Sequence, residues 1–203
     1  MYKHHPTIVL GFHACEKEIG EEILSGIKGF KASENEFDWL GHGMYFWENN
    51  ERRAVTYGQE LQEKRGQLED PMVIGAVINL GYCFDLLDAH SLEILAQSYH
   101  GLKTLTELVD NGELPVNSEA FPGDIDLLKR HLDCAVIQFM HSKMKANKEK
   151  EFDTVRGVFW EGKEIYPTSG FKEKNHIQIC VRNPNCIKGF FRPRELNKKF
   201  SRV

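Results

Sequence analysis

The chain has 203 residues, a length that suits one domain of ordinary size. Hydrophobic residues make up 41% and charged residues 28%, a balance that excludes a collagen-like, coiled-coil or disordered chain. Lys and Arg total 26 against 30 Asp and Glu, and this net charge of −4 argues against a protein that coats nucleic acid. No apolar stretch approaches the roughly 18 residues of a membrane span, and residues 1–6 are polar. We expect one cytoplasmic domain over residues 1–203 with no membrane partner.

The cysteine pattern excludes two kinds of small stabilised domain. Five cysteines occur at wide spacings and none forms a C-x-x-C pair. Such an arrangement fits neither a disulfide framework nor a zinc ribbon. We therefore expect reduced, mostly buried thiols and no metal.

The first third of the chain predicts two strand and helix pairs. Residues 7–13 (TIVLGFH) form a β-branched apolar run, and residues 16–24 carry apolar side chains at helical spacing. A loop then leads into a short strand at residues 41–47 (GHGMYFW), and residues 51–65 predict a second helix. We expect this helix to direct three apolar side chains inward: Ala54, Val55 and Leu61.

The remainder predicts a central strand, two helices and three short strands. Residues 72–80 (MVIGAVINL) are nearly all apolar, which is typical of a strand covered on both faces. Residues 91–109 have helical periodicity, with Leu92 and Leu105 among the expected inward positions. A second helix is predicted to bury Ile125, Leu128, Leu132, Ala135, Val136, Phe139 and Met140 and to end in the basic run 143–150. Strands at 155–160, 176–182 and 187–191 complete an α+β fold.

Three segments carry most of the chemical signal: GFHAC at 11–15, GHGMYFW at 41–47 and HIQICVRNPNCIKGFF at 176–191. In this order they resemble the ADP-ribosyltransferase family, in the branch related to diphtheria toxin and the poly(ADP-ribose) polymerases. The second segment matches that family's Gly-x-Gly-x-Tyr-Phe element residue for residue. Nearly the whole chain also looks like a group of uncharacterised bacterial proteins that we associate with this fold.

The resemblance implies a split β-sheet core with flanking helices and a glycosyltransferase activity. NAD would be a consumed co-substrate whose nicotinamide–ribose bond is cleaved, and ADP-ribose would pass to a protein, RNA or DNA acceptor. The sequence contains neither a Rossmann G-x-G-x-x-G nor a P-loop, so no hydride transfer is implied. Small enzymes of this type often act as toxins in defence systems, which implies a neutralising antitoxin partner.

The same resemblance assigns roles to residues of the first two segments. His13 would hydrogen-bond the adenosine ribose, and Ala14 would hold the nicotinamide amide through its backbone, provided that its φ stays negative. Tyr45 would stack on the nicotinamide ring, with Tyr57 as the opposite wall. Two further residues of the second segment are assigned to NAD binding: Gly43 and Phe46.

The third segment departs from the family pattern. Gln178 stands where the polymerase-like branch has a glutamate that stabilises the cationic ribose, and it would complete a catalytic set with His13 and Tyr45. Strand alternation places His176 on the same side as Gln178. Glu173, just before the strand, is a second-ranked source of the missing carboxylate, although a solvated loop position explains it at least as well.

Several features leave alternatives open. Arg156, on an otherwise apolar strand, either pairs with a buried acid or binds the NAD pyrophosphate. Trp39 either belongs to a loop that covers NAD or anchors that loop to the core. The basic run 143–150 is either a solvated helix end or part of a nucleic-acid groove. Because Gln178 brings no charge, a non-catalytic NAD or ADP-ribose binding module is the alternative to an enzyme, as is an NAD glycohydrolase.

Overall fold

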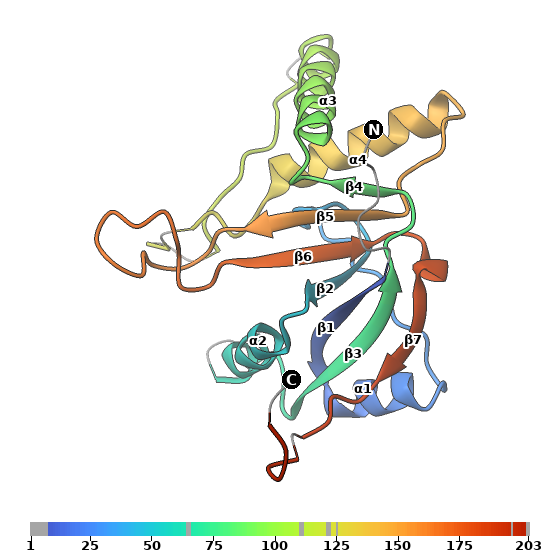
Figure 1. The fold of residues 1–203 in the computed structure, drawn as a ribbon. Helices are drawn as coiled ribbons and strands as arrows, with labels where there is room; N and C mark the ends of the chain where they lie inside the picture. The colour runs from blue at the N-terminus through green and yellow to red at the C-terminus, as the bar shows by residue number, and fades with distance from the viewer. Residues whose placement is uncertain are drawn as a thin grey trace.

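The computed structural model describes residues 8–63, 66–109, 112–120, 123–124, 126–195 and 197–201. These residues form a mixed α/β fold around a seven-stranded sheet with the strand order β4-β5-β6-β2-β1-β3-β7 (Figure 1). The elements in chain order are β1 (Ile8–Glu16), α1 (Lys17–Leu24), β2 (Met44–Glu48), α2 (Glu51–Glu63), β3 (Pro71–Asn79), β4 (Cys83–Asp85), α3 (Ala89–Glu107), α4 (His131–Ala146), β5 (Thr154–Phe159), β6 (His176–Val181), the 3-10 turn η1 (Pro184–Cys186) and β7 (Ile187–Phe191).

The sheet divides into two halves between β1 and β2. β1 pairs with β3 along its whole length, from Ile8 to Glu16, whereas its pairing with β2 stops at Phe12. β2 continues instead alongside β6. Figure 1 shows the result: β4, β5 and β6 run across the molecule, while β1, β3 and β7 run steeply beneath them. The two halves therefore part beyond Phe12, at the end of β1 that carries His13.

The sheet has two faces, which we call front and back. Side chains of paired residues lie on the same face of an antiparallel sheet. Trp47 defines the front face, where α2 packs through Ala54 and α4 packs through Ile137. Phe46 defines the back face, where a second core gathers residues of β1, β2, β3 and β6. Since both faces of the central strands are covered, these strands carry apolar residues on both sides, as predicted for 72–80.

Three predictions about the helices need correction. In α2, Ala54 and Leu61 are buried as expected, but Val55 is 40% exposed and Arg53 is buried in addition. In α3, Leu92 and Leu105 are about half exposed, at 49% and 53%, because the helix projects from the molecule and packs on α4 (Figure 1). α4 begins at His131, so the expected inward residue Leu128 precedes it.

The bounds of the other predicted strands and helices are confirmed to within a few residues. One strand of the structure, β4, was not predicted. β4 has three residues and lies parallel to β5, which is too short a segment to show periodicity. Four residues of the predicted elements, Thr7, Lys64, Arg65 and Ile125, lie outside the described part of the chain. Within the described part, no helix combines the length and the hydropathy needed to cross a membrane.

Candidate functional site

Strand register separates the three residues predicted to be catalytic. Trp47 pairs with Gln178, and Tyr45 lies two residues before Trp47 in β2, so all three side chains emerge on the front face. Phe12 pairs with Trp47, which directs the next side chain of β1, that of His13, to the back face. Tyr45 and Gln178 thus share a face that His13 does not.

His13 connects the two halves of the sheet. Its Nδ1 lies 2.9 Å from the carbonyl oxygen of Tyr45, so this nitrogen carries a proton and donates it. The ring packs edge-on against Phe30, with 4.7 Å between centroids, and lies near Phe46. Burial lowers the pKa of His13, which favours the neutral imidazole. These contacts give His13 a structural role; its contact with an adenosine ribose stays a prediction.

Tyr45 holds the glycine-flanked turn that precedes it. Its hydroxyl donates to the carbonyl oxygen of Gly41 at 2.7 Å and accepts from the N–H of Leu40 at 2.9 Å. Burial raises the pKa of Tyr45 well above its ordinary value. The turn is tightly packed, because a Cβ at Gly41 would lie 2.8 Å from Ile137 and one at Gly43 would lie 2.7 Å from the Val181 carbonyl oxygen. The described structure thus gives both glycines a packing role.

Gln178 is held by the loop that precedes β2. Its Oε1 accepts a hydrogen bond from Nε1 of Trp39 at 2.6 Å. The indole lies against Phe159, with 4.9 Å between centroids, and over Gly157, where a Cβ would be 2.9 Å from the indole ring. Trp39 therefore anchors its loop to the sheet, and the same bond orients the Gln178 amide.

Arg156 lies on the back face and is paired with acids. Its guanidinium donates to both carboxylate oxygens of Glu48 and to both of Asp85, at 3.0 and 3.2 Å for the latter. The hydrogen bond that Arg156 donates to Glu48 is the largest contribution to the raised pKa of Arg156. The open choice between a buried acid and a pyrophosphate is thus decided for the acid. Phe46, on the same face, is a fully buried core residue.

The other predicted residues have simple placements. Ala14 is buried on the front face beside Ala54. Its predicted role requires a negative φ, and Ala14 is not among the residues with positive φ. Glu173 is exposed, and its side chain packs close to Gly162 within the connection between β5 and β6. This exposure fits the solvated alternative that the sequence left open for Glu173.

A group of charged and aromatic side chains lies beside Gln178 on the front face, and the sequence analysis missed most of it. We call it the Trp47 cluster; its members are Trp47, Arg53, Tyr57, Glu60, Glu161, Lys174 and His176. They come from β2, α2, β6 and the segment between β5 and β6.

The charges of the Trp47 cluster balance. Arg53 donates to Glu161 at 2.8 Å and lies 3.7 Å from Glu60. Lys174 approaches the same two carboxylates, at 2.8 Å from Glu60 and 3.6 Å from Glu161. Arg53 is only 7% exposed, so this network lies within the protein, where charges interact strongly.

Flat side chains surround these charges. The rings of Trp47 and Tyr57 lie 5.0 Å apart, and the Arg53 guanidinium stands 5.8 and 5.5 Å from their centroids. The His176 ring is 6.2 Å from Trp47 and stacks on Phe159 at 5.6 Å. The cluster therefore combines aromatic faces with cationic groups.

Several buried polar atoms of this region have no hydrogen-bond partner among the described residues: Trp47 Nε1, Arg53 Nε and Nη1, Asn175 Oδ1 and His176 Nε2. His176 Nδ1 lies 2.6 Å from the Lys174 carbonyl oxygen and therefore donates to it. Burial lowers the pKa of His176, so Nε2 holds a lone pair. The site thus offers N–H donors from Trp47 and Arg53 and an acceptor from His176. Buried polar groups of this kind usually have partners, so the atoms point to a ligand or to ordered water.

One sequence signal could have revealed the cluster. Arg53, Tyr57 and Glu60 occupy positions i, i+4 and i+7 of the predicted helix and so share one of its faces. We took the neighbouring apolar positions as the buried stripe instead. The contributions of Glu161 and Lys174 could not be read in this way, because they lie in an irregular connection.

Comparison with known proteins gives a distant relative. The chain is 24% identical over 196 residues to an uncharacterised protein of Methanocaldococcus jannaschii. The matched region covers 87% of this chain and 83% of the relative. No known family matches the sequence. No solved structure matches it either. In the described part of the chain, no group of three or more His, Cys, Asp or Glu side chains could hold a metal ion.

Proposed function

We propose that this protein is an NAD-dependent ADP-ribosyltransferase that binds NAD beside Gln178 and passes ADP-ribose to a protein or nucleic-acid acceptor. One observation carries the proposal: the strands of the three motif segments, β1, β2 and β6, are neighbours at the centre of the sheet, and buried unpartnered atoms of Trp47 and His176 lie beside Gln178. The parting of β1 from β2 also fits the split sheet that the resemblance implies.

The Trp47 cluster supplies groups that this reaction uses. When the bond between nicotinamide and ribose breaks, the ring leaves as a neutral base and positive charge develops at the ribose. Tyr57, which is half-buried, offers aromatic surface for the departing ring, with stacking worth about 1 kcal/mol beyond the buried area. His176 Nε2 would accept a hydrogen bond from a ribose hydroxyl, next to the Gln178 amide.

Charge stabilisation is where this site differs from the family pattern. Gln178 is neutral, and Glu161, whose side chain is 13% exposed, is a carboxylate of the cluster that would act in its place. A carboxylate about 4 Å from a cation is worth roughly 4 kcal/mol at an effective dielectric of 20. However, Arg53 and Lys174 already neutralise much of the charge on Glu161. This observation favours slow chemistry and supports, as the second candidate, a module that binds NAD or ADP-ribose without cleaving it.

The test is to incubate the purified protein with radiolabelled NAD and a cell extract and to follow free nicotinamide and labelled macromolecule. Label on a polymer supports transfer, nicotinamide alone supports hydrolysis, and saturable NAD binding without either product supports the binding module. Glu161→Gln should lower the rate of cleavage at least tenfold. The matched control is Glu173→Gln, an exposed glutamate of the same connection between strands, which should leave the rate unchanged. Wild-type protein that neither binds nor cleaves NAD would overturn the proposal.

A further inference from the structure

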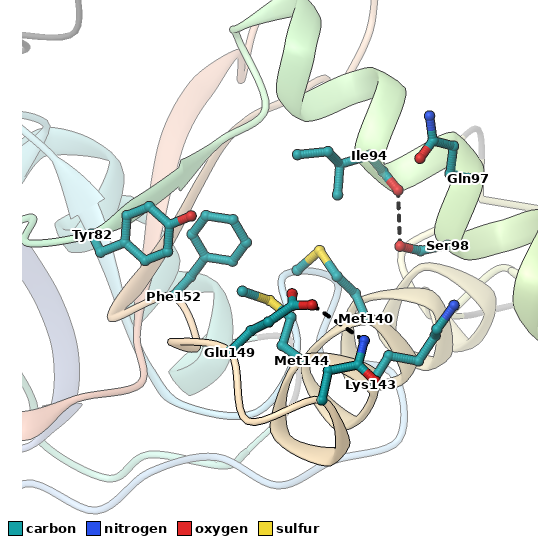
Figure 2. A pocket seen from close by; sticks show the side chains of 10 residues that line it. Tyr82, Ile94, Gln97, Ser98, Met140, Lys143, Met144, Glu149 and Phe152 are labelled. Carbon is teal, nitrogen blue, oxygen red and sulfur yellow. Dashed lines mark hydrogen bonds between the residues drawn. The ribbon is translucent and has the colours of Figure 1, made fainter.

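A hollow of about 330 Å³ lies between α3, the end of α4 and the segments that lead into β4 and β5, and it shares no residue with the Trp47 cluster (Figure 2). Its lining residues are Tyr82, Ile94, Gln97, Ser98, Met140, Lys143, Met144, Asn147, Glu149 and Phe152. The volume falls within the range of small-molecule sites.

One wall of the hollow is flat and aromatic. The rings of Tyr82 and Phe152 stack with 4.4 Å between centroids and 21° between planes. Tyr82 remains 44% exposed, although its ring is large and partly apolar. Figure 2 shows the thioethers of Met140 and Met144 below this wall and Ile94 across from it. Aromatic rings and polarisable sulfur atoms suit a planar ring better than a branched aliphatic group.

Polar groups of defined chemistry stand around the apolar floor. Figure 2 shows Gln97 on the α3 side and the Glu149 carboxylate on the α4 side. The end of α4 places Glu149: Lys148 adopts a left-handed φ of 60°, and the Glu149 N–H then donates back to the Met144 carbonyl at 2.9 Å. Asn147 Nδ2 donates to the same carboxylate at 3.2 Å. Glu149 therefore presents an oriented acceptor beside the hollow.

The surrounding charges are mixed, with lysines in slight excess. The basic run contributes Lys143, Lys145, Lys148 and Lys150, and the acids of the same segment are Glu149, Glu151 and Asp153. Lys150 Nζ stands 5.2 Å from the centroid of Tyr82 and 3.5 Å from Asp153. Lys143 lies on the rim of the hollow. Cations at the rim of a hollow with an aromatic wall suit a planar ligand that carries a phosphate outside the hollow.

We propose that this hollow binds a nucleobase that carries an exocyclic amino group, as a free nucleotide or within a single strand. The base packs against the exposed Tyr82 ring, its amino group donates to Glu149, and its phosphate meets Lys143. Carboxylates accept hydrogen bonds from exocyclic amines of bases, and glutamine amides pair with base edges. Uracil has no amino group, so it should bind more weakly. This inference does not rest on NAD cleavage.

The experiment titrates the full chain with AMP, CMP and UMP and with ten-nucleotide adenine and uracil RNA strands, by calorimetry and by amide chemical shifts. AMP and CMP should bind at least fivefold more tightly than UMP, with shifts centred on Gln97, Ser98 and Met144. An adenine strand that binds at least tenfold more tightly than AMP, with both affinities expressed per base, identifies single-stranded RNA as the source of the base. Equal affinities identify the free nucleotide.

Variants give the decisive comparison. Glu149→Met keeps a similar length but removes the carboxylate acceptor, so it should abolish the preference of AMP over UMP. Tyr82→Ala should weaken AMP binding about tenfold, whereas the matched control Tyr166→Ala, at a tyrosine that is 56% exposed elsewhere, should not. Gln97→Ala changes an exposed helix position, so it tests the site without threatening the fold. The proposal is overturned by equal binding of AMP and UMP, by an unchanged preference in Glu149→Met, or by shifts centred on the Trp47 cluster.

Discussion

The buried group of Arg156, Glu48 and Asp85 allows a test of structure against function at one residue. Their side chains are 14%, 11% and 7% exposed, and the arginine bridges the two acids across β2, β5 and β4. Arg156→Met keeps a similar apolar length but leaves two neighbouring carboxylates without their shared cation. Removing one partner of a buried ion pair costs about 3–5 kcal/mol, because the remaining charge is uncompensated. We therefore expect Arg156→Met to lower the free energy of unfolding by that amount.

The assay is urea unfolding followed by circular dichroism, with NAD affinity measured on the folded protein at the same temperature. The triple variant Arg156→Met, Glu48→Gln, Asp85→Asn removes all three charges together and should regain at least half of the lost stability. If instead Arg156→Met lost less than 1 kcal/mol and abolished NAD binding, the guanidinium would serve a pyrophosphate and our assignment of Arg156 would be refuted.

Two further predictions concern pH and packing. His141 is 2% exposed, and burial is the main cause of its pKa of about 4, against an ordinary value of 6.5. Between pH 6.5 and about pH 4, the unfolded chain binds more protons at His141 than the folded protein does, so stability falls as the pH drops through this window. From pH 7 to pH 5, His141 alone should lower the free energy of unfolding by about 2 kcal/mol. Urea unfolding of His141→Leu should show a pH-dependent loss smaller by that amount, and an identical loss would contradict the assignment. Gly157→Ala places a Cβ 2.9 Å from the Trp39 indole and should lower the unfolding free energy by about 1–3 kcal/mol, with a shifted Trp39 fluorescence. Its control, Gly189→Ala, has no atom within 4 Å of the new Cβ and should leave the unfolding free energy unchanged. Equal losses of unfolding free energy in both variants would show that the loss comes from replacing a glycine in a strand and not from the contact with the indole.

The periodic part of the fold was predictable from the sequence. The apolar run at 72–80 became β3, and the helical periodicity at 91–109 became α3, because each pattern depends only on the geometry of a single strand or helix. The alternation within 176–182 correctly separated Gln178 from Ile179, since successive strand residues point to opposite faces. In α2, periodicity correctly indicated that Ala54 and Leu61 are buried, but it could not indicate that the buried face would include Arg53 and leave Val55 exposed.

The candidate site was only partly predictable. The order of the motif segments predicted Tyr45, Tyr57 and Gln178 as site residues, and these residues lie on the front face together with His176 and Trp39. The distribution of side chains between the two faces was decided by strand pairing, because the register of Phe12 against Trp47 sends His13 to the back face. Contacts between distant segments likewise placed Glu161 beside Arg53 and Glu48 beside Arg156. The sequence by itself determined the local periodicities and the residue types available for chemistry; tertiary pairing alone determined which charges are buried together, since burial and ion pairing depend on neighbours that the linear order does not specify.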